Sequence, residues 1–307
     1  MLECFQMIPK EKINSFQKDI LSWYRLNKRD LPWRKTRNAY SILISEVMSQ
    51  QTQLSRVVLK YEAWMERFPT VETLAKASVA EVLEYWSGLG YNRRALHLKK
   101  TAESIVLNFN GEFPKTEKEL MSLPGIGKYT ANAVLCFAFD QQVVVVDTNI
   151  RKVIVTQFLN SENSEIQNSG KSEVLIIRDS EQLSYSSLPE KNNTKIDEKL
   201  IEELARQLLP AGQAYEWNQA LMDYASAVLK KEKIPIPKQS KFHGSHRYYR
   251  GQVLKQLLQN KKIAIKDLGF LIKKNYTEAE REWLQKLLEE LVKEGFITID
   301  EGKIFLS

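Results

Sequence analysis

Residues 123–131 read LPGIGKYTA and lead into the small and apolar run NAVLCFAF at 132–139. Gly125 and Gly127 follow a proline and precede a predicted helix at 128–139, so the backbone N–H groups beside them can approach an anion closely. A phosphate group is the ligand expected at such a hairpin. A tight turn between two helices, with no ligand, explains the same pattern. Lys128 adds an amine that could act as a nucleophile.

Helical periodicity surrounds this hairpin. Apolar residues recur at helical spacing over 13–27, 38–50, 53–67, 71–76, 79–87, 93–109, 116–122 and 128–139. The run QQVVVVD at 141–147 is rich in β-branched residues, and it predicts either a short strand or a buried connector. The first 160 residues are therefore predicted to form a compact helical array with short loops.

The composition changes abruptly after this array. Residues 160–197 are rich in Ser, Asn and Glu, which indicates a long surface insertion. Helical periodicity returns at 197–209 and 215–231, and KIPIPKQS at 233–240 has the composition of a linker. We therefore expect one domain over residues 1–240, interrupted at about 160–197, and a second domain over 241–307.

The last segment has a pattern of its own. Helices are predicted at 247–260, 264–274 and 277–294, and two short alternating strands flank Asp300, Glu301 and Gly302 as a hairpin. Three helices followed by a terminal hairpin are typical of a winged helix. Such a unit could bind DNA, bind a protein partner, or bind nothing.

The overall composition bounds the class of protein. Lys and Arg number 45 against 38 Asp and Glu, a formal net charge of +7, which is weak support for a nucleic-acid partner. Only Cys4 and Cys136 occur, which argues against a disulfide scaffold. The sequence contains no signal peptide pattern and no apolar run of about 18 residues, the length that indicates a membrane helix. We expect a cytoplasmic, monomeric protein with no membrane association.

Several motifs together carry a resemblance to a known family. LPGIGKYTANAV resembles the hairpin of the helix-hairpin-helix (HhH-GPD) superfamily of DNA glycosylases, most closely the adenine DNA glycosylases of the MutY type. The same order and spacing hold for LPWR at 31–34, SEVMSQQTQ at 45–53, GLGYNRRALHL at 88–98, VVDTNIRKV at 145–153 and WNQALMDYA at 217–225. The resemblance covers about residues 12–235. It implies a mainly α, two-lobed HhH-GPD fold and base excision from double-stranded DNA.

Two carboxylates fit the chemistry that such an enzyme performs. The enzyme extrudes a nucleotide and breaks its bond from C1′ to the base, which requires an acid at the base and a negative charge near the sugar. Glu46 has apolar neighbours that favour a protonated carboxyl group, and the resemblance gives it the role of protonating adenine N7 and later activating water. Asp147 precedes a predicted helix, so an N-cap is the plain explanation, and the resemblance places it near the sugar with Asn149 in support.

The position after the hairpin separates two reaction types. Family members that also cleave the backbone carry a Schiff-base lysine at the second residue after the last glycine. Here Lys128 is at the first position and Tyr129 at the second, and one residue along a helix turns a side chain by about 100°. We therefore expect a monofunctional enzyme that uses water. Lys128 is expected to contact a phosphate or solvent, and Tyr129 to contact the reacting nucleotide.

Further residues are assigned through the resemblance alone. Gln51 and Tyr91 correspond to residues that fill the gap left by the extruded base, although a core aromatic explains Tyr91 nearly as well. The other expected DNA- or substrate-binding residues are Thr52, Leu89, Gly125, Gly127 and Lys128 in the same motifs, and Trp33, Arg34 and Gln219 at the adenine pocket. A surface cation at a helix start is an alternative for Arg34.

The chain departs from the family in two places. Most members hold an iron–sulfur cluster with four cysteines just after the MDYA-like helix, but the corresponding positions here are Leu229, Ile236, Gln239 and Ser245, so we expect no cluster and no other metal or cofactor. The Nudix-like C-terminal domain of the family is replaced by the winged-helix-like segment. Its approach FHGSHRYYRGQ at 242–252 suits either a DNA backbone or packing on the first domain.

The leading interpretation is a monofunctional adenine DNA glycosylase that acts on A opposite 8-oxoguanine or G. One alternative is a thymine or uracil glycosylase of the same fold, because Ser49 stands where the adenine enzymes carry an apolar residue. Another is a non-catalytic DNA-binding protein, which the presence of both carboxylates disfavours, because binding needs neither and both would repel phosphate.

Overall fold

The computed structural model describes residues 8–159, 197–232 and 241–307. The predicted insertion at 160–197 lies almost wholly outside this range, as do the predicted linker at 233–240 and Cys4. In the described part of the chain, no helix combines the length and apolar character needed to cross a membrane.

The described chain is mainly helical, as expected. Residues 8–159 hold α1 (Lys10–Asn27), η1 (Pro32–Lys35), α2 (Ala39–Ser49), α3 (Leu54–Arg67), α4 (Val71–Lys76), α5 (Val79–Trp86), α6 (Arg93–Phe109), α7 (Glu117–Met121), α8 (Lys128–Phe139), α9 (Thr148–Ile154) and the π-helix η2 (Val155–Leu159). Later residues form α10 (Glu198–Leu208), α11 (Ala214–Ala227), α12 (His246–Asn260), β1 (Lys262–Ala264), α13 (Ile265–Ile272), η3 (Glu278–Glu280), α14 (Arg281–Glu294), β2 (Ile297–Asp300) and β3 (Lys303–Leu306).

The chain forms two compact units that do not follow sequence order. Unit 1 comprises residues 1–42, 115–117 and 127–237, and unit 2 comprises 43–114, 118–126 and 238–307, of which the structure describes the parts given above. Residues 241–307 thus fall in the same unit as α3 to α6. The expected division into domains at residue 240 stays a prediction.

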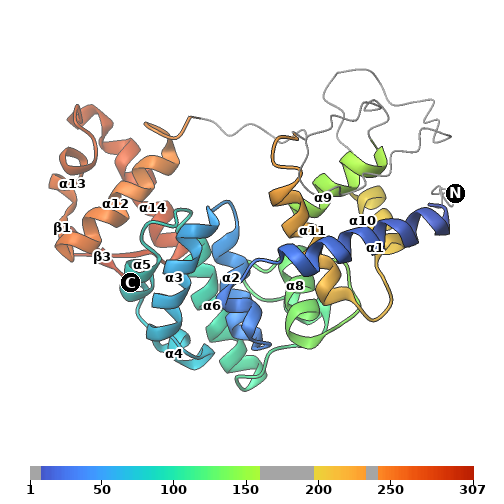
Figure 1. The fold of residues 1–307 in the computed structure, drawn as a ribbon. Coiled ribbons are helices and arrows are strands. Elements are labelled where there is room, and N and C mark those ends of the chain that lie inside the picture. The colour runs from blue at the N-terminus through green and yellow to red at the C-terminus, as the bar shows by residue number, and fades with distance from the viewer. Residues whose placement is uncertain (1–7, 160–196, 233–240) are drawn as a thin grey trace, which may run out of the picture. The chain divides into compact units, whose positions relative to one another are not determined.

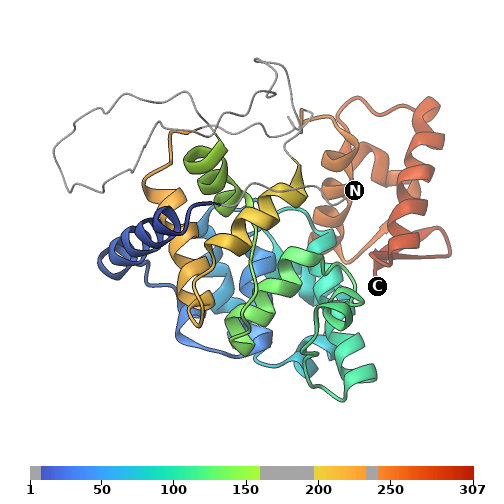
Figure 2. The same ribbon diagram turned by 90° about the vertical axis from the view of Figure 1, so that its right-hand side faces the viewer.

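Unit 1 is built around the packing of α1, α9, α10 and α11. Figures 1 and 2 both show α1 (blue) lying against α11 (orange). Phe16 of α1 meets Phe158 and Trp217 edge to face, at ring-centroid distances of 5.0 and 5.8 Å. The buried aliphatic side chains of α9 and α10, including Val153 and Leu204, complete this core. Because α9 is anchored here, its first residues are held firmly.

Unit 2 has a helical part, α3 to α6, and a C-terminal part. In the helical part, Trp64 of α3 packs edge to face on Trp86 of α5 at 5.7 Å. The C-terminal part, drawn in orange to red in Figure 1, packs α12, α13 and α14 beside a three-stranded antiparallel sheet in the order β1-β3-β2. The predicted hairpin is confirmed, with Asp300 opposite Lys303 and positive φ angles at Glu301 and Gly302 that suit a two-residue turn.

The run at 141–147 proves to be a connector. Residues 140–147 form neither helix nor strand in this described segment. Only Val145 of the four valines is fully buried, and its N–H donates to Oδ1 of Asn218 at 3.1 Å. Asn218 also donates to the carbonyls of Val143 and Ala214, at 3.1 and 2.8 Å. A helix side chain therefore takes the place of a neighbouring strand and fixes the path of the chain into Asp147.

Candidate functional site

In unit 2, Glu46 lies in the second half of α2. It is 9% exposed, between Ser45 at 1% and Val47 at 5%, so it is buried as the expected acid should be, and the alternative of a surface glutamate is excluded. The apolar face of α2, which includes Ile44 and Met48 with no exposed area, holds the helix in the core. The carboxyl group therefore sits on a rigid element, as proton transfer to a bound base requires.

The two loops expected to insert into DNA are tied together by one arginine. Nη1 of Arg94 donates to the carbonyl of Val47 at 2.7 Å and also to that of Gln50, at the end of α2. Its Nη2 donates to the carbonyl of Leu89 at 3.2 Å and, more weakly, to Oγ1 of Thr52 at 3.4 Å. Arg94 was not singled out from the sequence, although it lies within the GLGYNRRALHL motif.

The residues at the tips of these loops have an uncommon backbone. Gln51 has φ 54° and Tyr91 has φ 49°, both in the left-handed region that non-glycine residues rarely adopt. Gln51 is exposed, and Tyr91 is 44% exposed, so the alternative of a core aromatic does not hold for Tyr91. Strained backbone held by many surrounding bonds is common at functional sites. The geometry therefore suits residues that project from the surface.

Leu89, which is also expected to bind DNA, has a side chain that is only 4% exposed. It packs inside unit 2, and its contact with DNA stays a prediction. The reason for its burial is local. Leu89 lies between Gly88 and Gly90, both with positive φ, and this double turn folds its side chain inward while its carbonyl binds Arg94. Thr52 is half-buried and meets Arg94 as described above.

The two glycines of the hairpin differ. Gly125 has φ +75°, and a Cβ added there would lie 2.4 Å from Nδ1 of His97, so internal packing requires glycine. Gly127 has φ −92°, and no described atom lies within 4 Å of a Cβ added to it. Gly127 precedes α8, where the first N–H groups point outward. The fold does not itself require glycine at 127, so an external group that approaches the backbone would explain it.

In unit 1, the first turn of α8 carries Lys128 and Tyr129. Nζ of Lys128 forms an ion pair with Oε2 of Glu202 on α10 at 2.6 Å, and its side chain is 44% exposed. Lys128 therefore has a partner in the protein and also meets solvent, and its expected contact with a phosphate stays a prediction. Tyr129 is half-buried. Between Thr130 and Phe137 every residue is buried, which fixes the register of this helix.

Asp147 is the N-cap of α9. Its Oδ1 accepts from the N–H of Ile150 at 2.7 Å, and its Oδ2 accepts from Nδ2 of Asn149 at 2.7 Å, so Asn149 contacts the carboxylate that it is expected to support. Burial raises the pKa of the Asp147 carboxyl group, and these two hydrogen bonds only partly offset the effect. The carboxylate is thus held rigidly but is costly to ionise.

The residues expected at an adenine pocket gather around α11 and η1. Asp223 on α11 is 1% exposed and binds the guanidinium of Arg34 through two bonds of 2.7 Å each. Arg29 adds a backbone N–H at 3.0 Å and its Nε at 2.7 Å. Burial alone would raise the pKa of Asp223, but the bonds from Arg34 and Arg29 outweigh it and lower that pKa. Arg34 is therefore a buried ion-pair partner and not a surface cation.

Trp33 and Gln219 lie in the same unit and are both buried, at 8% and 5% exposure. Among the described residues, the amide of Gln219 is not one of the buried side-chain groups that lack a partner, so its expected contact with adenine stays a prediction. The sequence motif WNQALMDYA contained Asn218 and Asp223 without marking their roles. A lone Asn and a lone Asp within an apolar helix were the available signals.

The four positions that correspond to the iron–sulfur ligands do not fit a cluster. Leu229 is buried at 4% exposure, and Ser245 caps α12 by accepting from the N–H of Tyr248 at 3.3 Å. Ile236 and Gln239 lie outside the described residues, and neither side chain ligates iron. Cys136 is buried in α8, where it receives a weak bond from Asn218 at 3.4 Å.

The basic approach to the C-terminal segment is largely paired. His246 contacts Glu290 at 2.7 Å, and Arg250 contacts Glu290 at 2.9 Å and Glu294 at 2.6 Å. His246 and Arg250 thus meet carboxylates of α14, which lie within residues 241–307 as well. The two interpretations, a DNA backbone and packing on the first domain, stay predictions.

Comparisons with known proteins agree with this arrangement. The profile of the HhH-GPD superfamily base excision DNA repair protein matches residues 44–176, a range that contains Glu46, Tyr129 and Asp147. Adenine DNA glycosylase of Rattus norvegicus is 44% identical over 151 residues, which are 46% of this chain and 29% of that protein. The enzyme of Mycolicibacterium smegmatis is 49% identical over 137 residues, 44% of this chain and 47% of that protein. The chain thus matches less than half the length of these relatives.

Solved structures show the same fold. A thermostable thymine-DNA glycosylase aligns with a TM-score of 0.58 at 29% identity, over 73% of this chain and 90% of that one. An endonuclease III trapped on DNA aligns with a TM-score of 0.53 at 20% identity, over 71% of this chain and 86% of that one. Together with the profile that matches residues 44–176, this fold shows that the chain contains an HhH-GPD domain of the kind found in base excision DNA repair proteins.

Proposed function

We propose that this protein is a monofunctional DNA glycosylase that removes adenine opposite 8-oxoguanine or G from double-stranded DNA. The observation that carries the proposal is the pair of carboxylates within the matched profile: buried Glu46 on α2 and hydrogen-bonded Asp147 at the start of α9. Both stand on helices with buried apolar faces. The identity of 44% to 49% with adenine DNA glycosylases supports adenine as the base.

The reaction divides between these two groups. The Glu46 carboxyl group gives its proton to adenine, so that the bond from C1′ to N9 breaks with its electron pair leaving on the base. The Asp147 carboxylate stabilises the positive charge that develops on the sugar. Water then adds its oxygen to C1′, and the Glu46 carboxylate takes the released proton. Asn149 keeps the Asp147 carboxylate in place through the 2.7 Å bond.

The surrounding residues bind and open the DNA in this proposal. The N–H groups after Gly127 bind a phosphate, and Gln51 and Tyr91 fill the space of the extruded nucleotide. Trp33 and Gln219 line the adenine pocket, and Arg34 supports it through Asp223. Tyr129 in place of a Schiff-base lysine supports hydrolysis without strand cleavage. The protein acts as a monomer without an iron–sulfur cluster or other cofactor, and the proposal includes a cytoplasmic setting, with nucleoid association if the protein is prokaryotic.

One experiment tests the proposal against its alternatives. The protein is incubated with duplexes that contain A:8-oxoguanine, A:G, T:G or U:G, and products are compared with and without alkali. We expect adenine excision that becomes strand cleavage only after alkali, and at least 100-fold slower excision, a typical loss for a removed acid or charge, by Glu46→Gln and Asp147→Asn.

Each other outcome has a distinct meaning. Excision of T or U instead of A would favour the thymine or uracil glycosylase. Ser49 and the structural similarity to a thymine-DNA glycosylase are the observations behind this alternative. Strand cleavage without alkali would contradict the monofunctional mechanism. Tight DNA binding with no excision of any base would favour the non-catalytic alternative.

A further inference from the structure

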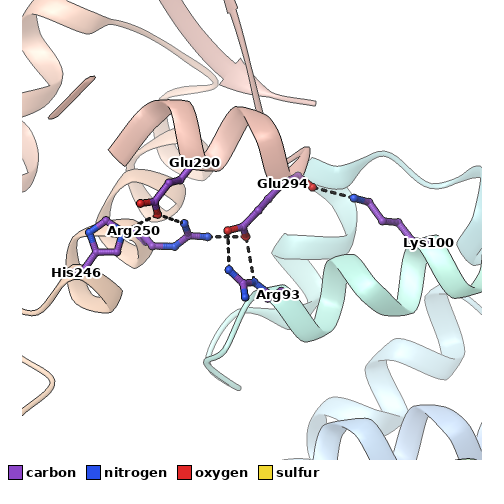
Figure 3. Close-up of polar contacts among 6 residues, drawn as sticks. All are labelled: Arg93, Lys100, His246, Arg250, Glu290 and Glu294. Carbon is purple, nitrogen blue, oxygen red and sulfur yellow. Dashed lines mark hydrogen bonds and ion pairs between the residues drawn. The ribbon is translucent and has the colours of Figure 1, made fainter. Parts of the chain in front are cut away.

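Glu294, the last residue of α14, joins the C-terminal part of unit 2 to α6. Its Oε1 lies 2.6 Å from Nη2 of Arg93, and its Oε2 accepts from Nε of Arg93 at 3.2 Å (Figure 3). Oε2 also meets Nη2 of Arg250 at 2.6 Å. Burial alone would raise the pKa of Glu294, but the hydrogen bonds from Arg93 and Arg250 lower it. One carboxylate thus binds two guanidinium groups, one from each part.

Backbone contacts reinforce this junction. Nζ of Lys100 donates to the carbonyl of Glu294 at 2.9 Å, at the C-terminal end of α14, where unpaired carbonyls favour a cation (Figure 3). Arg93 and Lys100 are seven residues apart, and therefore on the same face of α6. The carbonyl of Ser307 accepts from the N–H of Val79, at the start of α5, at 3.1 Å. The C-terminal part therefore contacts α5 and α6 through two residues, Glu294 and Ser307.

The residue next to this junction holds the loops that are expected to insert into DNA. Arg93 and Arg94 are the first two residues of α6. Arg93 turns toward Glu294, whereas Arg94 turns inward and binds carbonyls at the end of α2 and in the loop before α6. Its Nε is buried without a partner among the described residues, and burial lowers the pKa of its guanidinium. Because Arg94 belongs to the first turn of α6, the position of that turn sets where its guanidinium meets the carbonyls of Gln50 and Leu89.

We infer that residues 241–307 are a positioning element for DNA opening: through Glu294 they hold the first turn of α6, and through Arg94 that turn sets the loops of Gln51 and Tyr91. The inference rests on the proposed function. It assigns a task to a segment that the matched profile, over residues 44–176, does not include. Because Gln51 and Tyr91 sit in left-handed backbone, their positions depend on the bonds that Arg94 supplies.

The test removes the charge of Glu294 in the full chain. Glu294→Gln keeps the size of the side chain, and Glu282→Gln is the control, because Glu282 lies on the same helix and pairs only across its surface with Lys286 at 3.2 Å. Circular dichroism confirms folding of each variant. Excision is measured in single turnover on A:8-oxoguanine, and opening by the fluorescence of 2-aminopurine beside the target.

We expect Glu294→Gln to slow excision by about threefold to tenfold, the size of a coupling between neighbouring elements, and to reduce the fluorescence rise. Removing an acid should strengthen general DNA binding, so slower excision would not come from weaker affinity. The defect should shrink when the target adenine faces an abasic site, because an unpaired base needs less energy to leave the stack. Arg94→Lys keeps the positive charge but loses the planar guanidinium group that binds several carbonyls. It should slow excision and reduce the fluorescence rise more than Glu294→Gln does.

Three results would overturn the inference. Glu294→Gln could excise and open DNA like Glu282→Gln. It could be slowed equally on paired and unpaired targets, which would place the effect in folding or chemistry. Arg94→Lys could open DNA like the wild type. By contrast, a wild-type protein that excises no base from any duplex would contradict the proposed function. In that case the 2-aminopurine fluorescence of Glu294→Gln, compared with that of Glu282→Gln, would still test the positioning role.

Discussion

Asp147 combines two demands that oppose each other. As an N-cap it needs only an acceptor, which either Asp or Asn supplies, but as a charge beside the sugar it must be ionised. Burial raises the pKa of its carboxyl group, so the ionised form costs free energy of folding at neutral pH. Because the folded pKa is raised, folding favours the protonated form of this carboxyl group. That contribution to stability is fully present below the unfolded pKa of 3.8, and it is lost as the pH rises through the higher folded pKa.

Asp147→Asn should therefore abolish excision while leaving the free energy of unfolding at pH 7 equal or larger. The advantage over the wild type should disappear below about pH 4, where both side chains are neutral. Urea unfolding at a series of pH values measures this. Asp147→Ala, which removes the cap, should be less stable than Asp147→Asn by about 1 kcal/mol. A variant Asp147→Asn that is clearly less stable than the wild type at pH 7 would refute this account.

The same raised pKa predicts a pH dependence of activity. Excision requires Asp147 ionised, so its rate should fall as the pH drops through a value above the ordinary range for aspartate. Single-turnover rates between pH 4 and pH 8, about four units that cover such a shift, would show it. A rate that stays constant down to the ordinary aspartate pKa would contradict the assignment of the charge to Asp147.

Gln51 is exposed, and its backbone is strained. With φ 54°, it should gain up to about 1 kcal/mol of stability when replaced by glycine, because glycine adopts this conformation freely. Gln51→Gly should therefore melt at the same or a higher temperature and yet excise more slowly, because nothing fills the gap in the duplex. Asn110→Gly, at the end of α6 with φ 53°, is the matched control and should leave excision unchanged. Unchanged excision by Gln51→Gly would exclude the insertion role.

At the scale of elements, α11 organises unit 1 by polar side chains. Asn218 fixes the connector that leads into Asp147, and one turn later Asp223 fixes the segment with Arg29 and Arg34. Gln219 lies between them on the same helix. A single rigid helix thus orders the charged cap and the expected adenine pocket together.

Asp223→Asn should destabilise unit 1 by about 3 to 5 kcal/mol, because it leaves the buried guanidinium of Arg34 without a counter-charge. The pKa of Asp223 is lowered, so its contribution is present above the unfolded pKa of 3.8 and is lost as the pH falls through the lower folded pKa. Glu216→Gln, an exposed change on the same helix, is the control. Urea unfolding measures both, and equal stabilities would contradict the role of the pair.

The pair between α8 and α10 makes a prediction about DNA affinity. Glu202→Gln should free Lys128 for a phosphate and steepen the dependence of log affinity on log salt by about 0.9, the value for one more phosphate contact. Glu203→Gln, whose carboxylate meets Arg206 at 3.2 Å, changes the charge equally and is the control. Titrations at several salt concentrations measure the slope. Identical slopes would show that Lys128 does not reach DNA.

For the whole molecule, the sequence predicted local elements well and long-range pairing poorly. The helices at 71–76, 93–109 and 128–139 begin and end where the structure has them, because apolar spacing and caps are local signals. The strand β1 was missed, since three residues carry too little pattern. The bonds of Glu294 to Arg93, 201 residues away, leave no trace in either segment. Motif order predicted Glu46 and Asp147, but not that Asn218, Asp223 and Arg94 position the residues around them.

The contrast between the two hairpin glycines has a consequence for genetics. Gly125→Ala meets both an unfavourable φ and His97, whereas Gly127→Ala meets no described atom. Consider a library of alanine variants that is selected first for correct folding and then for suppression of mutations in the cell. Gly125→Ala should fail the selection for folding. Gly127→Ala should fold, but it should not suppress mutations. Two alanine substitutions only two residues apart would thus separate a folding defect from a DNA-binding defect.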